Sequence, residues 1–120
     1  MIYFIGDKPS KHNIDPKVAF VGTQSYKTLL NWIYRMNLNI NDITLYNVDS
    51  FVNQLQQNKL ELDEDDQVVA LGKEAAIILN KHIIPHLKIP HPSGLNRKLN
   101  DTEFVNGFLK ECKVYVLQKW

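Results

Sequence analysis

The sequence contains a single cysteine, Cys112, so it has no means of forming an internal disulfide or a cysteine-based zinc or iron–sulfur site. A reducing compartment fits this composition. No apolar run is long enough for a membrane span or a signal-peptide core, because the opening apolar stretch stops at Gly6. We therefore predict a cytoplasmic protein that does not associate with membranes.

The chain has no large excess of charge of either sign, since 14 lysines and arginines face 13 aspartates and glutamates. A formal net charge of +1 is unlike that of proteins that coat nucleic acid, although basic residues still have the option of gathering on one face. The five glycines form no phosphate-binding loop, because Gly72-Lys73-Glu74 lacks the required glycine spacing and the closing Lys-Ser/Thr. This disfavours a nucleotide kinase.

The 120 residues, 44% of them hydrophobic, suffice for one sizeable core and are too few for two ordinary domains. We predict a single domain over residues 1–120. Short apolar or β-branched runs predict strands at 2–5, 43–46, 68–71, 87–89 and 114–117. Helical spacing predicts helices from Tyr26 to about residue 37, over 50–57 and 73–81, and after Asp101, with Ser25 and Asp101 as N-caps.

This alternation of strands and helices predicts a three-layer α/β/α fold with a mainly parallel central sheet. Such sheets place ligands beyond the carboxyl ends of their strands. The loops at Gly6, Asn47, Gly72 and His91 should therefore converge at one edge.

Five segments in these loops and strands carry a family resemblance: 6–10 (GDKPS), 19–22 (AFVG), 44–48 (TLYNV), 69–75 (VALGKEA) and 91–97 (HPSGLNR). Their order and approximate spacing resemble those of the uracil-DNA glycosylase superfamily. The last segment is the most specific, because it joins a His-Pro-Ser opening to a Pro-Ser-Gly-Leu core. The resemblance spans most of the chain and implies an enzyme that hydrolyses the N-glycosidic bond of uracil or a related damaged or modified base in DNA.

The resemblance also assigns roles near the reacting bond. Asp7 would stabilise positive charge on the sugar or orient water, and His91 would donate a hydrogen bond to the departing base. Phe20 would stack on the extruded base, and the Asn47 amide would pair with its edge. Read without the resemblance, Asp7 caps or stiffens a turn, Phe20 is a core aromatic and Asn47 satisfies a turn through its side chain.

DNA contacts are implied for the last segment. Ser93 and the Gly94 backbone would hold phosphates, Leu95 would wedge into the vacated stack, and Arg97 would pair with the DNA backbone. Without the resemblance, Leu95 is an ordinary apolar loop anchor, and Arg97 and Lys98 form a solvated surface pair. The histidines at 12, 82 and 86 form no evident ligand set, so we predict no metal and no cofactor.

Two features depart from the family pattern. Lys8 stands where several active branches have aspartate or asparagine. The cysteines that bind an iron–sulfur cluster in one branch are also missing. Two alternatives therefore stay open beside the glycosylase: a catalytically weak DNA- or base-binding module, and an enzyme acting on free nucleotides. In each case we expect a monomer.

Overall fold

A four-stranded sheet lies at the centre of the computed structural model, which describes residues 1–7, 24–92 and 97–117. Its strands are β1 (Ile2–Gly6), β2 (Ile43–Asn47), β3 (Gln67–Leu71) and β4 (Leu87–Ile89). They lie in the order β2-β1-β3-β4, and every pairing is parallel. Parallel neighbours need a crossover between them, which explains why helices separate the strands along the chain.

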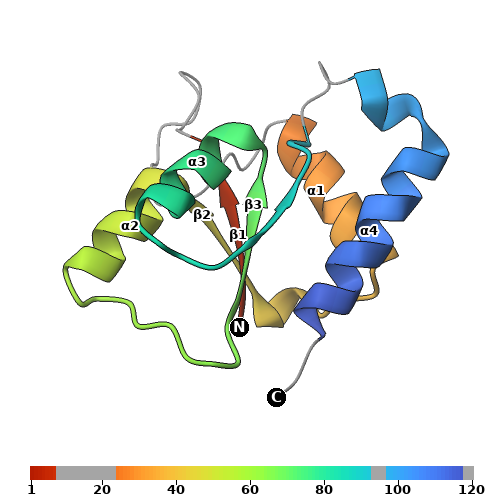
Figure 1. Ribbon diagram of the computed structural model, residues 1–120. Coiled ribbons are helices and arrows are strands. Elements are labelled where there is room, and N and C mark those ends of the chain that lie inside the picture. Colours follow the sequence, from red (N-terminus) through yellow and green to blue (C-terminus); the bar gives the residue numbers. More distant parts are fainter. Residues whose placement is uncertain (8–23, 93–96, 118–120) are drawn as a thin grey trace.

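Helices cover both faces of this sheet (Figure 1). The described helices are α1 (Gln24–Arg35), α2 (Val48–Gln56), α3 (Lys73–Lys81) and α4 (Thr102–Val116), with short 3₁₀ turns η1 (Ile40–Asp42) and η2 (Arg97–Asn100). Figure 1 shows α2 and α3 on one side of the sheet and α1 and α4 on the other. The predicted three-layer α/β/α fold with a parallel sheet is confirmed.

Two hydrophobic cores follow from the alternation of side chains along the strands. Ile2 and Phe4 of β1 point into the core that α1 and α4 complete, with Trp32 and Phe108 packed edge to face at 5.0 Å. Ile5, from the other face of β1, lies in the core under α2 and α3. Burial on both faces explains why the central strands are continuously apolar instead of alternating.

Most expected elements are confirmed, and α3 and β4 have the predicted bounds. Asp101 caps α4 as expected, since its side chain accepts hydrogen bonds from the backbone N–H groups of Glu103 at 3.0 Å and Phe104 at 3.3 Å. The prediction that Ser25 caps the first helix is wrong. The helix already begins at Gln24, which places Ser25 inside its first turn.

The prediction of a closing strand over 114–117 is also wrong, because α4 continues to Val116. Its buried side chains Leu109, Cys112 and Val116 follow one another at helical spacing and pack onto the sheet. A short run of β-branched and aromatic residues carries only a weak preference for a strand, and burying this helical face overrides it.

Within the described part of the chain, no helix is both long and apolar enough to span a lipid bilayer.

Candidate functional site

The candidate site lies at the carboxyl edge of the sheet, where the strand ends are level. Gly6 at the end of β1 pairs in register with Asn47 at the end of β2. On the other side, Leu71 at the end of β3 pairs with Ile89 at the end of β4. The residues that follow β1, β3 and β4 therefore meet at one edge, which is where ligands bind in open parallel sheets.

Asp7 and His91 face each other at this edge, although 84 positions separate them in the sequence. His91 Nε2 lies 3.9 Å from Asp7 Oδ2, and the two side chains are 29% and 31% exposed. This distance exceeds that of a hydrogen bond but allows attraction whenever the imidazole is protonated. The structure thus brings together the two residues that the resemblance marks as catalytic.

The pKa of Asp7 is raised above its usual value. Burial of the carboxyl group is the largest cause, and the negative charge of Glu74 acts in the same direction. His91 and a hydrogen bond with the Ala75 backbone oppose the shift without cancelling it. Asp7 Oδ1 is buried and has no hydrogen-bond partner among the described residues.

Asp7 also lies against the beginning of α3. The N-cap of this helix is Gly72, which has no side chain to accept a hydrogen bond. The Asp7 carboxylate, which hydrogen-bonds the backbone of Ala75 at the third position of α3, takes the place of a capping side chain. The positive end of the helix dipole favours a carboxylate at this position.

Gly72 brings the end of β3 close to His91. Its φ of +98° lies in the region that favours glycine, and a Cβ at this position would be 2.9 Å from His91 Cβ. The Gly72 N–H donates a 2.8 Å hydrogen bond to the Ile89 carbonyl, which links the ends of β3 and β4. A side chain at position 72 would therefore displace His91.

Asn47 ends β2 and is only 1% exposed. It precedes α2 as the N-cap residue, yet its side chain makes no capping hydrogen bond. The preceding residue, Tyr46, belongs to an aromatic cluster, 6.1 Å from Tyr3 and 5.5 Å from Phe51 between ring centroids. Tyr46 is thus a packing residue.

A pocket of about 410 Å³ opens beside His91. Its lining combines backbone and side chains from the strand ends with three lysines and one aromatic ring: Gly72, Lys73, Lys88, Ile89, Pro90, His91, Lys98 and Phe104. Sequence reasoning did not single out Lys88 or Phe104, and it treated Lys98 as part of a solvated pair. The lysines are ten or more positions apart in the sequence, so no local pattern indicates that they share a pocket.

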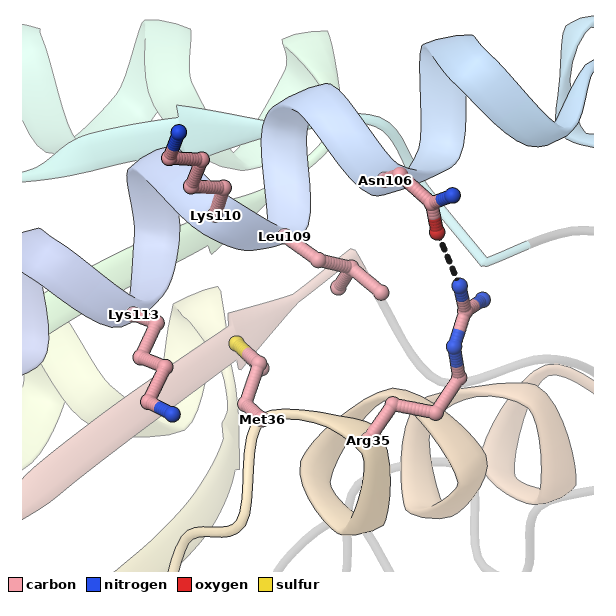
Figure 2. A pocket seen from close by; sticks show the side chains of 6 residues that line it. All are labelled: Arg35, Met36, Asn106, Leu109, Lys110 and Lys113. Carbon is pink, nitrogen blue, oxygen red and sulfur yellow. Dashed lines mark hydrogen bonds between the residues drawn. The ribbon is translucent and has the colours of Figure 1, made fainter.

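A second pocket, of about 220 Å³, lies between α1 and α4 (Figure 2). Met36 and Leu109 are its buried residues, and the Arg35 guanidinium donates a hydrogen bond to the Asn106 side-chain oxygen across the two helices. Figure 2 shows the amino groups of Lys110 and Lys113 pointing away from each other. Because these two amino groups do not point toward a common ligand position, we regard this pocket as a gap between packed helices and not as a binding site.

The remaining predicted site residues are Phe20, Ser93, Gly94 and Leu95, which lie outside the described residues. Arg97 is exposed at the first position of η2, directly before a residue that lines the 410 Å³ pocket. Among the described residues, no three histidine, cysteine, aspartate or glutamate side chains come close enough to hold a metal ion.

Comparison with known proteins identifies a family. The family model described as "Uracil DNA glycosylase superfamily" matches residues 1–113, which is nearly the whole chain. A search of curated proteins gave no match.

Proposed function

The chain belongs to the uracil DNA glycosylase superfamily, and from this membership we propose that it hydrolyses the N-glycosidic bond of uracil or a related damaged or modified base in DNA. The observation that supports this proposal is the pair formed by Asp7 and His91 at the carboxyl edge of the sheet. The pair provides one group for each of the two charges that separate when this bond breaks.

In the proposed reaction, the bond between the sugar carbon and the base nitrogen breaks and the electron pair leaves with the base. His91 donates a hydrogen bond to the base oxygen on which negative charge develops. Asp7, as a carboxylate, stabilises the positive charge on the sugar and orients the attacking water. Water adds to the sugar carbon, its proton is released, and the products are the free base and an abasic site.

The partly buried position of Asp7 suits this role. In a partly dehydrated site its charge is screened less than in water, so it stabilises a nearby cation more strongly. Its raised pKa means that the carboxylate form is reached at a higher pH than for an exposed aspartate. We therefore expect the rate to fall on the acid side of this pKa.

The other contacts follow from the family resemblance. We propose that Asn47 reads the base edge and that Phe20 stacks on the base. Ser93, Gly94, Leu95 and Arg97 would hold and wedge the DNA strand. Each of these assignments is separate from the Asp7 and His91 pair, so each has its own variant as a test.

The decisive experiment is single-turnover incubation with single- and double-stranded DNA containing uracil, followed by alkaline cleavage at abasic sites. We expect wild-type protein to generate the product and His91→Gln and Asp7→Asn to lower its rate about 100-fold, in the range of general acid–base catalysis. His82→Gln and Asp49→Asn, which change exposed residues outside the site, serve as matched controls. Equal rates for site and control variants would contradict the assignment.

A second candidate function rests on Lys8, which replaces the aspartate or asparagine of several active branches. In that case the chain is a binding module that has kept the pocket and lost most catalysis. Uracil-dependent binding without any abasic product, even with protein in excess, would favour this module over the enzyme.

A further inference from the structure

The helices α1, α2 and α3 end with the same backbone motif. The second residue after each helix has a positive φ, and its N–H group and the next one bond back to carbonyls of the last turn. These residues are Asn37, Asn58 and Ile83, with φ of 57°, 56° and 56°. Asparagine tolerates this left-handed conformation, whereas a β-branched side chain is strained in it. The motif therefore explains the two asparagines but not Ile83.

Packing within the chain does not explain Ile83 either, because this residue is 88% exposed. Ile77, one turn before Lys81 on the same face of α3, is 54% exposed. Lys81 and His82 are also exposed, and neither side chain forms an ion pair with another described residue. We call these four residues the α3 end surface. A strained residue that gains no contact inside the chain indicates a contact outside it.

The α3 end surface lies at the amino edge of the sheet. Helix α3 begins at the carboxyl edge directly after β3 and leads back to the beginning of β4. Leu87, the first residue of β4, pairs with Val69 in the middle of β3, so the residues before Leu87 pass beside the first half of β3. Glu74 lies in the first turn of α3, at the opposite end of the helix. The surface is therefore at the other edge of the sheet from Asp7 and His91.

A segment of opposite charge lies at the same amino edge. Residues 61–66 contain five acids and one leucine, and they come directly before β3. Leu62 is 36% exposed and stands between the exposed acids Glu61 and Asp63. Asp66 pairs with the amino group of the first residue and not with Lys81. The segment thus combines an apolar side chain with negative charge, where the α3 end surface combines apolar side chains with positive charge.

We propose that the α3 end surface binds residues 61–66 of a second copy of this chain, which gives a dimer with two-fold symmetry. In such a dimer the same two patches meet twice, and each copy supplies one of each. Ile77 and Ile83 contact Leu62 of the other copy, and Lys81 attracts its carboxylates. A second copy is the occupant because the chain itself carries the complementary segment at the same edge.

This dimer leaves the carboxyl edge with Asp7 and His91 open, so it is separate from the proposed function. It also differs from the monomer expected from the sequence. A left-handed isoleucine is not visible as a local sequence pattern, because its φ is set by how the helix ends.

The first test measures the mass of the protein against its concentration by sedimentation equilibrium. Ile83→Asn introduces the residue that ends α1 and α2, so the monomer should resist urea better, while the dimer dissociation constant should rise about tenfold. Tyr34→Asn is the matched control, because Tyr34 is 83% exposed on α1, across the sheet from α3 (Figure 1). A wild type that keeps the mass of one chain up to about 1 mM would overturn the proposal. So would an equal effect of the two variants on the dimer.

The second test reverses charges and mixes the variants. Lys81→Glu and the double variant Glu61→Lys/Asp63→Lys each place like charges across the interface, so each should stay monomeric by itself. In a mixture of the two, the opposed charges again differ in sign, and we expect a mixed dimer by native mass spectrometry. Lys27→Glu, which makes the same change on α1, should still dimerise alone. The absence of a mixed dimer would overturn the proposal. Neither test uses DNA, so the glycosylase proposal stands or falls separately.

Discussion

At the scale of single residues, Asp7 combines two tasks in one carboxyl group. It faces His91 across the candidate site, and it hydrogen-bonds the backbone at the beginning of α3. The capping contact favours the charged form, but burial opposes it more strongly and raises the pKa of Asp7. The charged carboxylate is therefore less favourable in the folded protein than in the unfolded chain, which lowers stability wherever Asp7 is ionised.

This cost gives a pH-dependent prediction for Asp7→Asn. The folded-state pKa lies above the usual value of 3.8, so the native protein binds more protons than the unfolded chain between these two values. The contribution of Asp7 to stability therefore falls as the pH rises from about 3.8 through the folded-state pKa, and it stays low above it.

We expect the free energy of unfolding of Asp7→Asn, relative to that of the wild type, to increase over this pH range. Urea denaturation at a series of pH values would measure it. Asp49→Asn, which alters an exposed carboxylate, is the control and should show no comparable trend. A relative stability of Asp7→Asn that decreases with rising pH would show that the capping contact outweighs burial.

At the scale of elements, the contact between the turn after β3 and the loop after β4 determines the shape of the site. Gly72 allows this approach because it has no side chain. Its φ of +98° disfavours other residues, and a Cβ at position 72 would lie only 2.9 Å from His91 Cβ. His91 is therefore positioned by the packing of two elements against each other as well as by its own loop.

Gly72→Ala should consequently destabilise the protein by about 1–3 kcal/mol, the usual cost of a strained backbone position. It should also lower any activity, because His91 must move. Gly107→Ala is a matched control: Gly107 lies within α4, and a Cβ there meets nothing within 4 Å. This second variant should gain about 0.5–1 kcal/mol from helix propensity. Urea denaturation measures the free energy of unfolding of both variants. Similar changes in the two would contradict the close contact between Gly72 and His91.

Helix α4 shows how far local patterns predict elements. The periodicity after Asp101 predicted the helix and its cap, and both are present. The same reasoning assigned 114–117 to a strand, because β-branched residues cluster there. Local β-propensity takes no account of the burial of Val116 against the sheet. That burial depends on where the helix packs in the folded protein.

At the scale of the whole molecule, a net charge of +1 hides an uneven distribution. Five acidic residues lie within positions 61–66, directly before β3 and thus at the amino edge of the sheet. The amino group of Met1 lies 3.2 Å from Asp66 Oδ1 at the same edge. The lysine-lined pocket lies at the opposite, carboxyl edge. A near-neutral total is therefore compatible with binding an anionic strand on one side.

Neutralising the acidic segment tests this separation of charge. A five-residue strand is about 16 Å long at roughly 3.3 Å per residue, which is about twice the Debye length of about 8 Å at physiological ionic strength. We expect the double variant Glu64→Gln/Asp65→Asn to change Kd for DNA by less than about twofold at that ionic strength. A larger increase in affinity would instead place the segment near the DNA.

The sequence alone determined most of the strands and helices, the parallel three-layer class and the family, because apolar periodicity, turn residues and motif order are local properties. It also identified Asp7 and His91 as candidates. Only the tertiary structure decided the strand order, the 3.9 Å approach of these two side chains and the extension of α4 to Val116. It alone brought Lys73, Lys88 and Lys98 around one pocket. These features depend on contacts between residues far apart in the chain, and such contacts form only when the helices and strands bury their apolar faces together.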